Sequence, residues 1–182
     1  PKVGSGWRAL CAQRQPSSPD LLFGALFSHC EKRLTNILYR RLWDREDVAD
    51  VIQEAFLRLW DRREGVEWVG AEALVFKIAL NLAKSRLRWR RVRQFTGLTE
   101  DEVSAAEAEL GVQLDDARDE AALRRALDAL PDKQRRVLLM ATFSEMSYED
   151  IAKVVGVSAG TVASRRHHAV EKLRALVQEQ GR

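Results

Sequence analysis

Residues 147–176 read SYEDIAKVVGVSAGTVASRRHHAVEKLRAL, and this pattern predicts two helices joined by a tight turn. Ser147 stands three positions before Asp150, so its side chain can cap the first helix. Gly156 can end that helix, because glycine adopts positive φ at little cost. Ser158 can then cap the second helix. The stretch therefore predicts a helix-turn-helix.

The second of these helices has an apolar face and a polar face. In a helix-turn-helix that binds DNA, the N-terminal half of the second helix enters the major groove. Arg165 can pair there with guanine edges, and hydroxyls near the helix start can hold phosphates. The same spacing also fits two packed helices of an all-α protein that never contacts DNA. Candidates for the outward face are Ser158, Thr161, Ser164, Arg165 and His168.

Length and composition favour a packed protein without membrane spans. The chain has 182 residues, of which 46% are hydrophobic and 31% charged, enough for one ordinary domain or two small ones. No apolar stretch approaches the roughly 20 residues of a membrane helix, and no signal peptide is evident. We therefore expect a cytoplasmic protein that does not insert directly into a membrane.

Cysteine and histidine usage predicts neither a metal site nor a cofactor. Cys11 and Cys30 are too few for a disulfide framework, and we expect both thiols to be reduced and packed. His29, His167 and His168 are scattered and do not have metal-ligand spacing.

The small net charge of +3 hides a strong pattern along the chain. Residues 1–96 have a net charge of +7, residues 97–120 a net charge of −8, and residues 121–182 a net charge of +4. The acidic stretch has the composition of a solvated linker, within which residues 105–114 could form a weak helix. The charges thus predict two basic modules that flank an acidic connector.

Helical periodicity dominates the first module. Apolar residues recur at helical spacing over about 20–41, 44–60 and 71–94, and no segment shows a sustained alternation with a period of two. Pro16 and Pro19 mark the start of the first helix. We therefore expect an all-α fold.

The helix expected at 44–60 carries an acidic stripe of Asp47, Asp50 and Glu54 opposite its apolar face. Three interpretations remain open for this stripe. It can be a solvated face, or a docking face for a basic partner together with Gln53, Leu57 and Trp60. It can also belong to a metal-dependent catalytic site, although one stripe supplies no converging ligands.

The end of the helix expected at 71–94 is strongly basic. Six like charges within ten residues repel one another, and an anionic partner such as nucleic acid would relieve this repulsion. A solvated helix end is the alternative, because cations are also favoured near a helix C-terminus. Trp68, Phe76 and Trp89 lie around this segment, and flat side chains beside cations suit unstacked bases. The cations are Lys84, Arg86, Arg88, Arg90, Arg91 and Arg93.

Three motifs in order resemble the bacterial sigma-70 factors, specifically the small extracytoplasmic-function (ECF) group. Residues 44–60, DREDVADVIQEAFLRLW, are similar to the region 2.2 helix. Residues 76–83, FKIALNLA, followed by arginines, are similar to regions 2.3 and 2.4. Residues 130–135, LPDKQR, together with the helix-turn-helix, are similar to region 4. The resemblance covers about 21–93 and 121–177.

This resemblance implies a role for each surface. The helix at 44–60 would bind core RNA polymerase at the clamp of its largest subunit, the flap being a further contact, and residues 61–70 would receive a flipped base of the minus-10 element. The polymerase-binding residues would be Asp47, Asp50, Gln53, Glu54, Phe56 and Leu57. The minus-10 contacts would be Trp68, Lys77, Asn81, Lys84, Ser85, Arg88 and Arg91. The duplex minus-35 element would be read by Ser158, Thr161, Val162, Ser164, Arg165 and His168.

The chain departs from the family pattern at three positions. Ala163 stands where a lysine is frequent, so one expected phosphate contact is missing. Arg166 replaces a usual leucine on the inner-facing periodicity, and Leu74 stands where the group often has tryptophan. The promoter sequence cannot be carried over from the family.

The resemblance implies an N-terminal extension (1–20), a region 2 domain (21–96), an acidic linker (97–120) and a region 4 domain (121–182). We expect a non-catalytic alternative sigma factor that binds core polymerase, recognises the two promoter elements as duplex and single-stranded DNA, and promotes opening. An anti-sigma factor is an expected further partner. Two rival classes are a polymerase-independent helix-turn-helix regulator and a nuclease with a metal at the acidic stripe.

Overall fold

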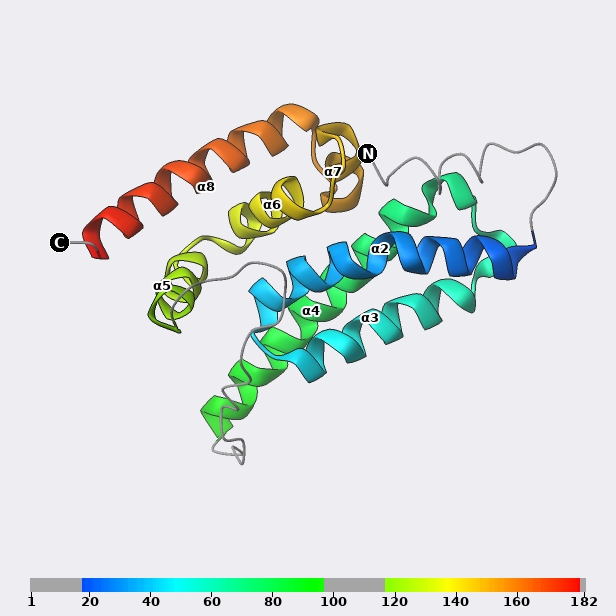
Figure 1. Ribbon diagram of the computed structural model, residues 1–182, viewed down its shortest axis with the longest axis horizontal. Helices are drawn as coiled ribbons and strands as arrows, with labels where there is room; N and C mark the ends of the chain where they lie inside the picture. Colours follow the sequence, from blue (N-terminus) through cyan, green and yellow to red (C-terminus); the bar gives the residue numbers. More distant parts are fainter. Residues whose placement is uncertain (1–17, 97–116, 181–182) are drawn as a thin grey trace. The chain divides into compact units, whose positions relative to one another are not determined.

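The computed structural model describes residues 18–96 and 117–180, and within these ranges every regular element is a helix (Figure 1). The all-α expectation is confirmed. The chain divides into two compact units, Pro1–Ala106 and Glu107–Arg182. No described helix is long and apolar enough to cross a membrane.

The first unit is a bundle of three long helices. They are α2 (Pro19–Leu42), α3 (Arg45–Trp60) and α4 (Ala71–Thr96), and each packs against the other two. Two short 3-10 turns, η1 (Arg63–Gly65) and η2 (Trp68–Gly70), connect α3 to α4. The three helices agree with the ranges expected from periodicity to within one or two residues.

A two-residue turn reverses the chain between α2 and α3. Trp43 adopts a left-handed conformation with φ 54°, and its N–H donates to the Tyr39 carbonyl at 2.7 Å. Asp44 is extended, and its carboxylate accepts from the Asp47 N–H at 2.9 Å, which caps α3. So short a connection makes α2 and α3 antiparallel neighbours.

The core of the first unit contains aliphatic residues from all three helices and a set of aromatic rings. Phe56 packs edge-on against Phe23 and Phe27, with ring centroids 5.7 and 4.9 Å apart. Cys30 is a free thiol in this core, and burial raises its pKa to about 12. The expectation of a packed, reduced thiol is confirmed for Cys30, whereas Cys11 lies outside the described residues.

The second unit contains α5 (Ala117–Asp128), α6 (Asp132–Phe143), α7 (Tyr148–Val155) and α8 (Ala159–Gln180). Helix α8 packs against all three of the others. Because α5 begins at Ala117, the last four residues of the segment expected to be linker are helical. The weak helix expected at 105–114 lies outside the described residues.

The turn between α7 and α8 has the expected geometry. The Ser147 hydroxyl accepts from the Asp150 N–H at 3.1 Å and caps α7. Gly156 ends α7 with φ 71°, and its N–H donates to the Ala152 carbonyl at 2.8 Å. The Ser158 hydroxyl accepts from the Thr161 N–H at 3.2 Å at the start of α8. The predicted helix-turn-helix is confirmed.

Substitution of Gly156 tests the turn. We expect Gly156→Ala to destabilise the second unit by about 1 kcal/mol, because a Cβ is disfavoured at positive φ. The matched control is Gly160→Ala in the first turn of α8, where helix propensity predicts a gain of roughly 0.5 kcal/mol. Thermal unfolding followed by circular dichroism measures both changes. Equal effects of the two substitutions would contradict the assigned turn.

Candidate protein and nucleic-acid interfaces

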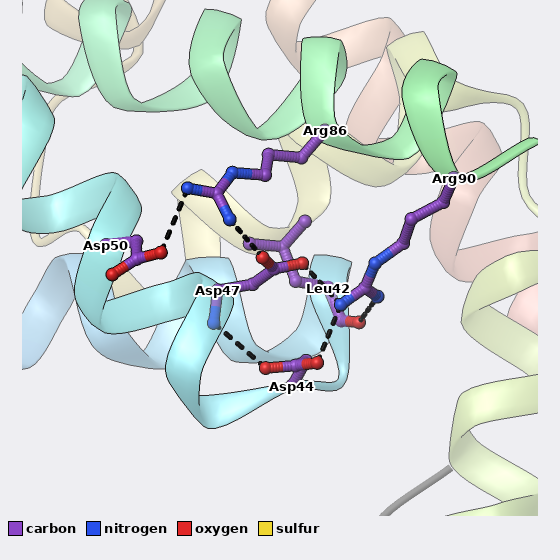
Figure 2. A network of polar contacts seen from close by, with 6 residues as sticks. All are labelled: Leu42, Asp44, Asp47, Asp50, Arg86 and Arg90. Carbon is purple, nitrogen blue, oxygen red and sulfur yellow. Dashed lines mark hydrogen bonds and ion pairs between the residues drawn. The ribbon is translucent and has the colours of Figure 1, made fainter. Parts of the chain in front are cut away.

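Two arginines of α4 bind three aspartates at the start of α3 (Figure 2). Arg86 forms ion pairs with Asp47 and, at 3.1 Å, with Asp50. Arg90 forms ion pairs with Asp47 and, at 2.7 Å, with Asp44, and it donates to the Leu42 carbonyl at 2.9 Å. We call these three aspartates and two arginines the α3–α4 ion cluster.

The cluster is only partly exposed, and Asp47 lies at its centre. The Asp47 side chain is 14% exposed and contacts both guanidinium groups, whereas the Asp50 side chain is 60% exposed. Partial burial lowers the pKa of Arg86, but hydrogen bonds with Asp50 and Asp47 and their charges raise that pKa by more, so the net direction is upward. Arg86 is therefore held more firmly in its charged form.

The cluster changes the interpretation of the acidic stripe on α3. The Asp47 carboxylate binds two arginines of its own chain, a contact that none of the three interpretations of the stripe includes. Glu54 pairs with Arg58 one turn later at 2.7 Å, and both side chains remain about half exposed. Gln53 and Leu57 are exposed, Leu57 by 49%. Of the residues that the resemblance assigns to polymerase binding, Asp50, Gln53, Glu54 and Leu57 therefore form the open surface of α3.

Phe56 lies beneath this surface and not on it, although the resemblance implies a polymerase contact at this position. Its side chain is 3% exposed and packs against two rings of α2. Phe56 follows Ile52 by four residues and Val48 by eight, so it lies on the buried side of the helix. It supports the α3 surface from beneath.

The basic run of α4 also divides between two faces. Six residues predicted to contact the minus-10 element are exposed and follow one another at spacings of three, four or one residues, which places them on one side of the helix. This α4 basic face consists of Lys77, Asn81, Lys84, Ser85, Arg88 and Arg91. None of its four cations pairs with an acid of the described ranges. The aspartates of the α3–α4 ion cluster neutralise Arg86 and Arg90. Part of the repulsion expected among the six cations is therefore relieved within the protein.

The connection that precedes α4 is anchored on both sides. Arg63 stacks on the Trp60 ring at 4.5 Å and donates to the Trp60 carbonyl at 3.1 Å. At the start of α4, the buried Glu72 pairs with Arg33 at 2.7 Å and contacts His29 at 3.3 Å. The turn between these anchors holds Trp68, which is half-buried.

The same turn exposes an apolar side chain that the sequence reading did not select. Val69 is 79% exposed in η2, and Trp89 is 62% exposed on α4. Trp89 can be found from the sequence, because an aromatic residue within a cationic run is a recognisable signal. A lone valine in a short turn gives no such signal.

The N-terminal half of α8 presents most of the predicted minus-35 residues on one side. Ser158, Ser164 and His168 are exposed, while Thr161 and Arg165 are half-buried beside them. The Ser158 and Thr161 hydroxyls lie 2.9 Å apart, and the Ser164 hydroxyl lies 3.4 Å from the His168 ring.

Two positions of α8 lie elsewhere than expected. Val162 is fully buried and packs in the core, although the resemblance implies a DNA contact at this position. Arg166 is exposed, which shows that α8 is not rotated to bury it. Within the ranges 18–96 and 117–180, no group of three or more His, Cys, Asp or Glu side chains could hold a metal ion.

Comparison with known families identifies both units. Residues 26–93 match sigma-70 region 2, and residues 120–173 match sigma-70 region 4. The chain is 31% identical over 162 residues to the ECF RNA polymerase sigma factor SigL of Mycobacterium tuberculosis, covering 88% of this chain and 91% of SigL. The chain belongs to the sigma-70 family. It is an alternative sigma factor of the ECF group, which directs RNA polymerase.

Further relatives agree with this assignment. The sigma factor is 32% identical over 132 residues to the RNA polymerase sigma-E factor of Streptomyces antibioticus, covering 72% of this chain and 71% of that one. A solved structure of CnrH with the cytosolic domain of CnrY has a similar fold, with a TM-score of 0.67 at 22% identity over 95% of this chain and 96% of that chain. The sigma factor RpoE of Bartonella quintana, solved with the anti-sigma factor NepR, has a TM-score of 0.64 at 25% identity over 87% and 97%.

Adjacent residues of α3 provide a direct test of its two faces. We expect Phe56→Ala to lower the free energy of unfolding by about 3–5 kcal/mol, because it removes a buried ring from the core. Leu57→Ala removes an exposed side chain and should change that free energy by less than about 0.5 kcal/mol. Chemical denaturation of the two variants measures the difference. Comparable losses would show that the assignment of the two faces is wrong.

Proposed function

We propose that the open surface of α3 docks this sigma factor on the largest-subunit clamp of core polymerase. The surface combines an exposed leucine with polar and acidic side chains, a composition suited to a basic partner surface with an apolar centre. Phe56 anchors α3 on Phe23 of α2, and the α3–α4 ion cluster holds Asp50 through Arg86. Polymerase therefore meets a preformed rigid face, which lowers the entropic cost of docking.

The α4 basic face is proposed to hold the minus-10 element as its strands separate. Four cations and two polar side chains form one continuous stripe, so phosphates of a single strand can follow the helix. Trp68 and Val69 in the preceding turn lie on the same connection as the start of this helix, where an unstacked base can be received. The continuity of this stripe on a single rigid helix is the observation that best supports the proposal.

The α8 face is proposed to read the minus-35 element as duplex in the major groove. Arg165 supplies a bidentate donor for guanine, and Ser158, Ser164 and His168 surround it. Ala163 is exposed without a charge, so this helix has fewer phosphate contacts than the family pattern predicts. The affinity of this helix for DNA therefore depends more strongly on its remaining contacts, Arg165 among them.

Other parts of the proposal concern partners and chemistry. Because RpoE of Bartonella quintana was solved with an anti-sigma factor, we extend a partner of this kind to the present sigma factor. The protein is proposed to act in the cytoplasm with polymerase, and to catalyse no reaction itself. Arg86 and Arg90 neutralise the carboxylates that a nuclease metal would need. A polymerase-independent regulator leaves the region 2 match unexplained.

Docking can be tested by reversing the character of Leu57. We expect Leu57→Arg to abolish co-elution with core polymerase and to reduce run-off transcription across a promoter library at least tenfold, because a new cation would meet a basic partner surface. The control is Leu21→Arg, which introduces the same charge at a more exposed apolar residue on α2. Retained co-elution of the Leu57 variant would contradict the docking surface.

Minus-35 reading can be tested with two neighbouring arginines. On a promoter recovered from that library, Arg165→Ala should weaken holoenzyme binding by about 1–3 kcal/mol and relax preference at one base pair. Arg166→Ala changes an exposed arginine outside the proposed reading face and should leave base preference unchanged. Measured affinities for single-base promoter variants distinguish the two. Relaxed preference in the Arg166 variant alone would refute the assignment.

A further inference from the structure

Arg86 and Arg90 lie on the opposite side of α4 from its DNA-binding stripe. Successive residues of a helix rotate by about 100° around its axis. Arg86 and Arg90 each stand two positions from Arg88, so their side chains leave the helix about 160° away from that of Arg88. Both belong to the arginine-rich run that resembles the minus-10 region, but the resemblance assigns neither of them a DNA contact and gives them no other role. The structure separates them by their contacts.

The charge around these two arginines is unfavourable for a phosphate. Their guanidinium groups contact the carboxylates of Asp44, Asp47 and Asp50, so the cluster carries a net charge of −1. A phosphate would have to displace at least one carboxylate from each arginine while meeting two others nearby. Lys84, Arg88 and Arg91 lack such neighbours among the described residues and offer their charge at no such cost.

The position of the cluster along α4 shows what it holds in place. The last fully buried residue on the described part of α4 is Ala83. Among the described side chains beyond it, only those of Arg86, Leu87 and Arg90 are partly buried, and the others are exposed. Arg86 ties this segment to α3, and Arg90 ties it to the turn between α2 and α3 through Leu42 and Asp44. The second half of the α4 basic face depends on these ties for its orientation.

We propose that Arg86 and Arg90 are positioning residues, which fix the α4 basic face relative to the α3 docking face without contacting DNA. This inference rests on the proposed function of both faces. Asp50 links the two, because its carboxylate pairs with Arg86 and also borders the docking surface. The distance between bound polymerase and the captured strand is thereby set inside a single bundle.

The salt dependence of promoter binding tests this proposal. The holoenzyme is assayed on a promoter recovered by run-off transcription, and log K is plotted against log salt concentration. Arg88→Gln should reduce the slope by about 0.7–0.9, the value expected for one lost phosphate contact. Arg86→Gln should leave the slope unchanged while lowering affinity and open-complex yield severalfold at temperatures where the variant is folded.

A conservative substitution separates positioning from phosphate contact. Lysine serves as a point charge for phosphate but lacks the planar fork through which guanidinium holds two carboxylates in a fixed geometry. Arg88→Lys should therefore keep near wild-type affinity, whereas Arg86→Lys should retain most of the defect of Arg86→Gln. The proposal is overturned if Arg86→Gln reduces the salt slope as Arg88→Gln does, if Arg86→Lys restores binding, or if Arg86→Gln has no effect.

A double-mutant cycle, measured by thermal unfolding of the free protein, tests the proposal without DNA. Arg86→Gln should lower the unfolding midpoint by a few degrees in the wild-type background and by clearly less beside Asp47→Asn, because the second substitution has already removed the Arg86–Asp47 ion pair and leaves only the pair with Asp50. Equal shifts in both backgrounds would overturn the role of the cluster. Failure of wild-type holoenzyme to bind any promoter overturns the proposed function itself, an outcome distinct from either result for Arg86.

Discussion

The contact between Asp47 and the two arginines of α4 is the interaction on which the proposed surfaces depend. It joins residues almost forty positions apart, and it involves the acidic stripe and the basic run that look separate along the chain. Partly exposed ion pairs add little to stability. Their value here is geometric, because a planar guanidinium held by two carboxylates permits few orientations of one helix on the other.

In the second unit, helix caps and the backbone geometry of a turn orient the helix that carries the proposed DNA contacts. Ser147 and Ser158 begin two helices, and Gly156 permits the turn between them. Val162 and Ala169 then bury one side of α8, which leaves Arg165 half-buried at the border of that side and Ser164 and His168 exposed beside it. Both units therefore present their proposed DNA contacts from a helix that is packed along another side.

Local sequence patterns predicted the bounds of the helices well. They predicted only in part which side of each helix is buried. Caps, prolines and apolar spacing give the bounds of α2, α3 and α4 almost to the residue, because these signals act within one turn. Phe56 and Val162 were placed on contact surfaces through the family resemblance, although their helical spacing from buried neighbours predicted the core. The pairing of Asp47 with Arg86 could not be foreseen, because it depends on how two helices are rotated against each other.

The central claim is that the arginines of α4 divide between positioning and DNA contact. The most direct measurement is a structure of the holoenzyme on an opened promoter, determined by electron cryomicroscopy at side-chain resolution. The account predicts that Arg86 and Arg90 remain on Asp47 and Asp44 while Lys84, Arg88 and Arg91 lie along the separated strand. Release of Arg86 or Arg90 from its aspartates onto a DNA phosphate would contradict it.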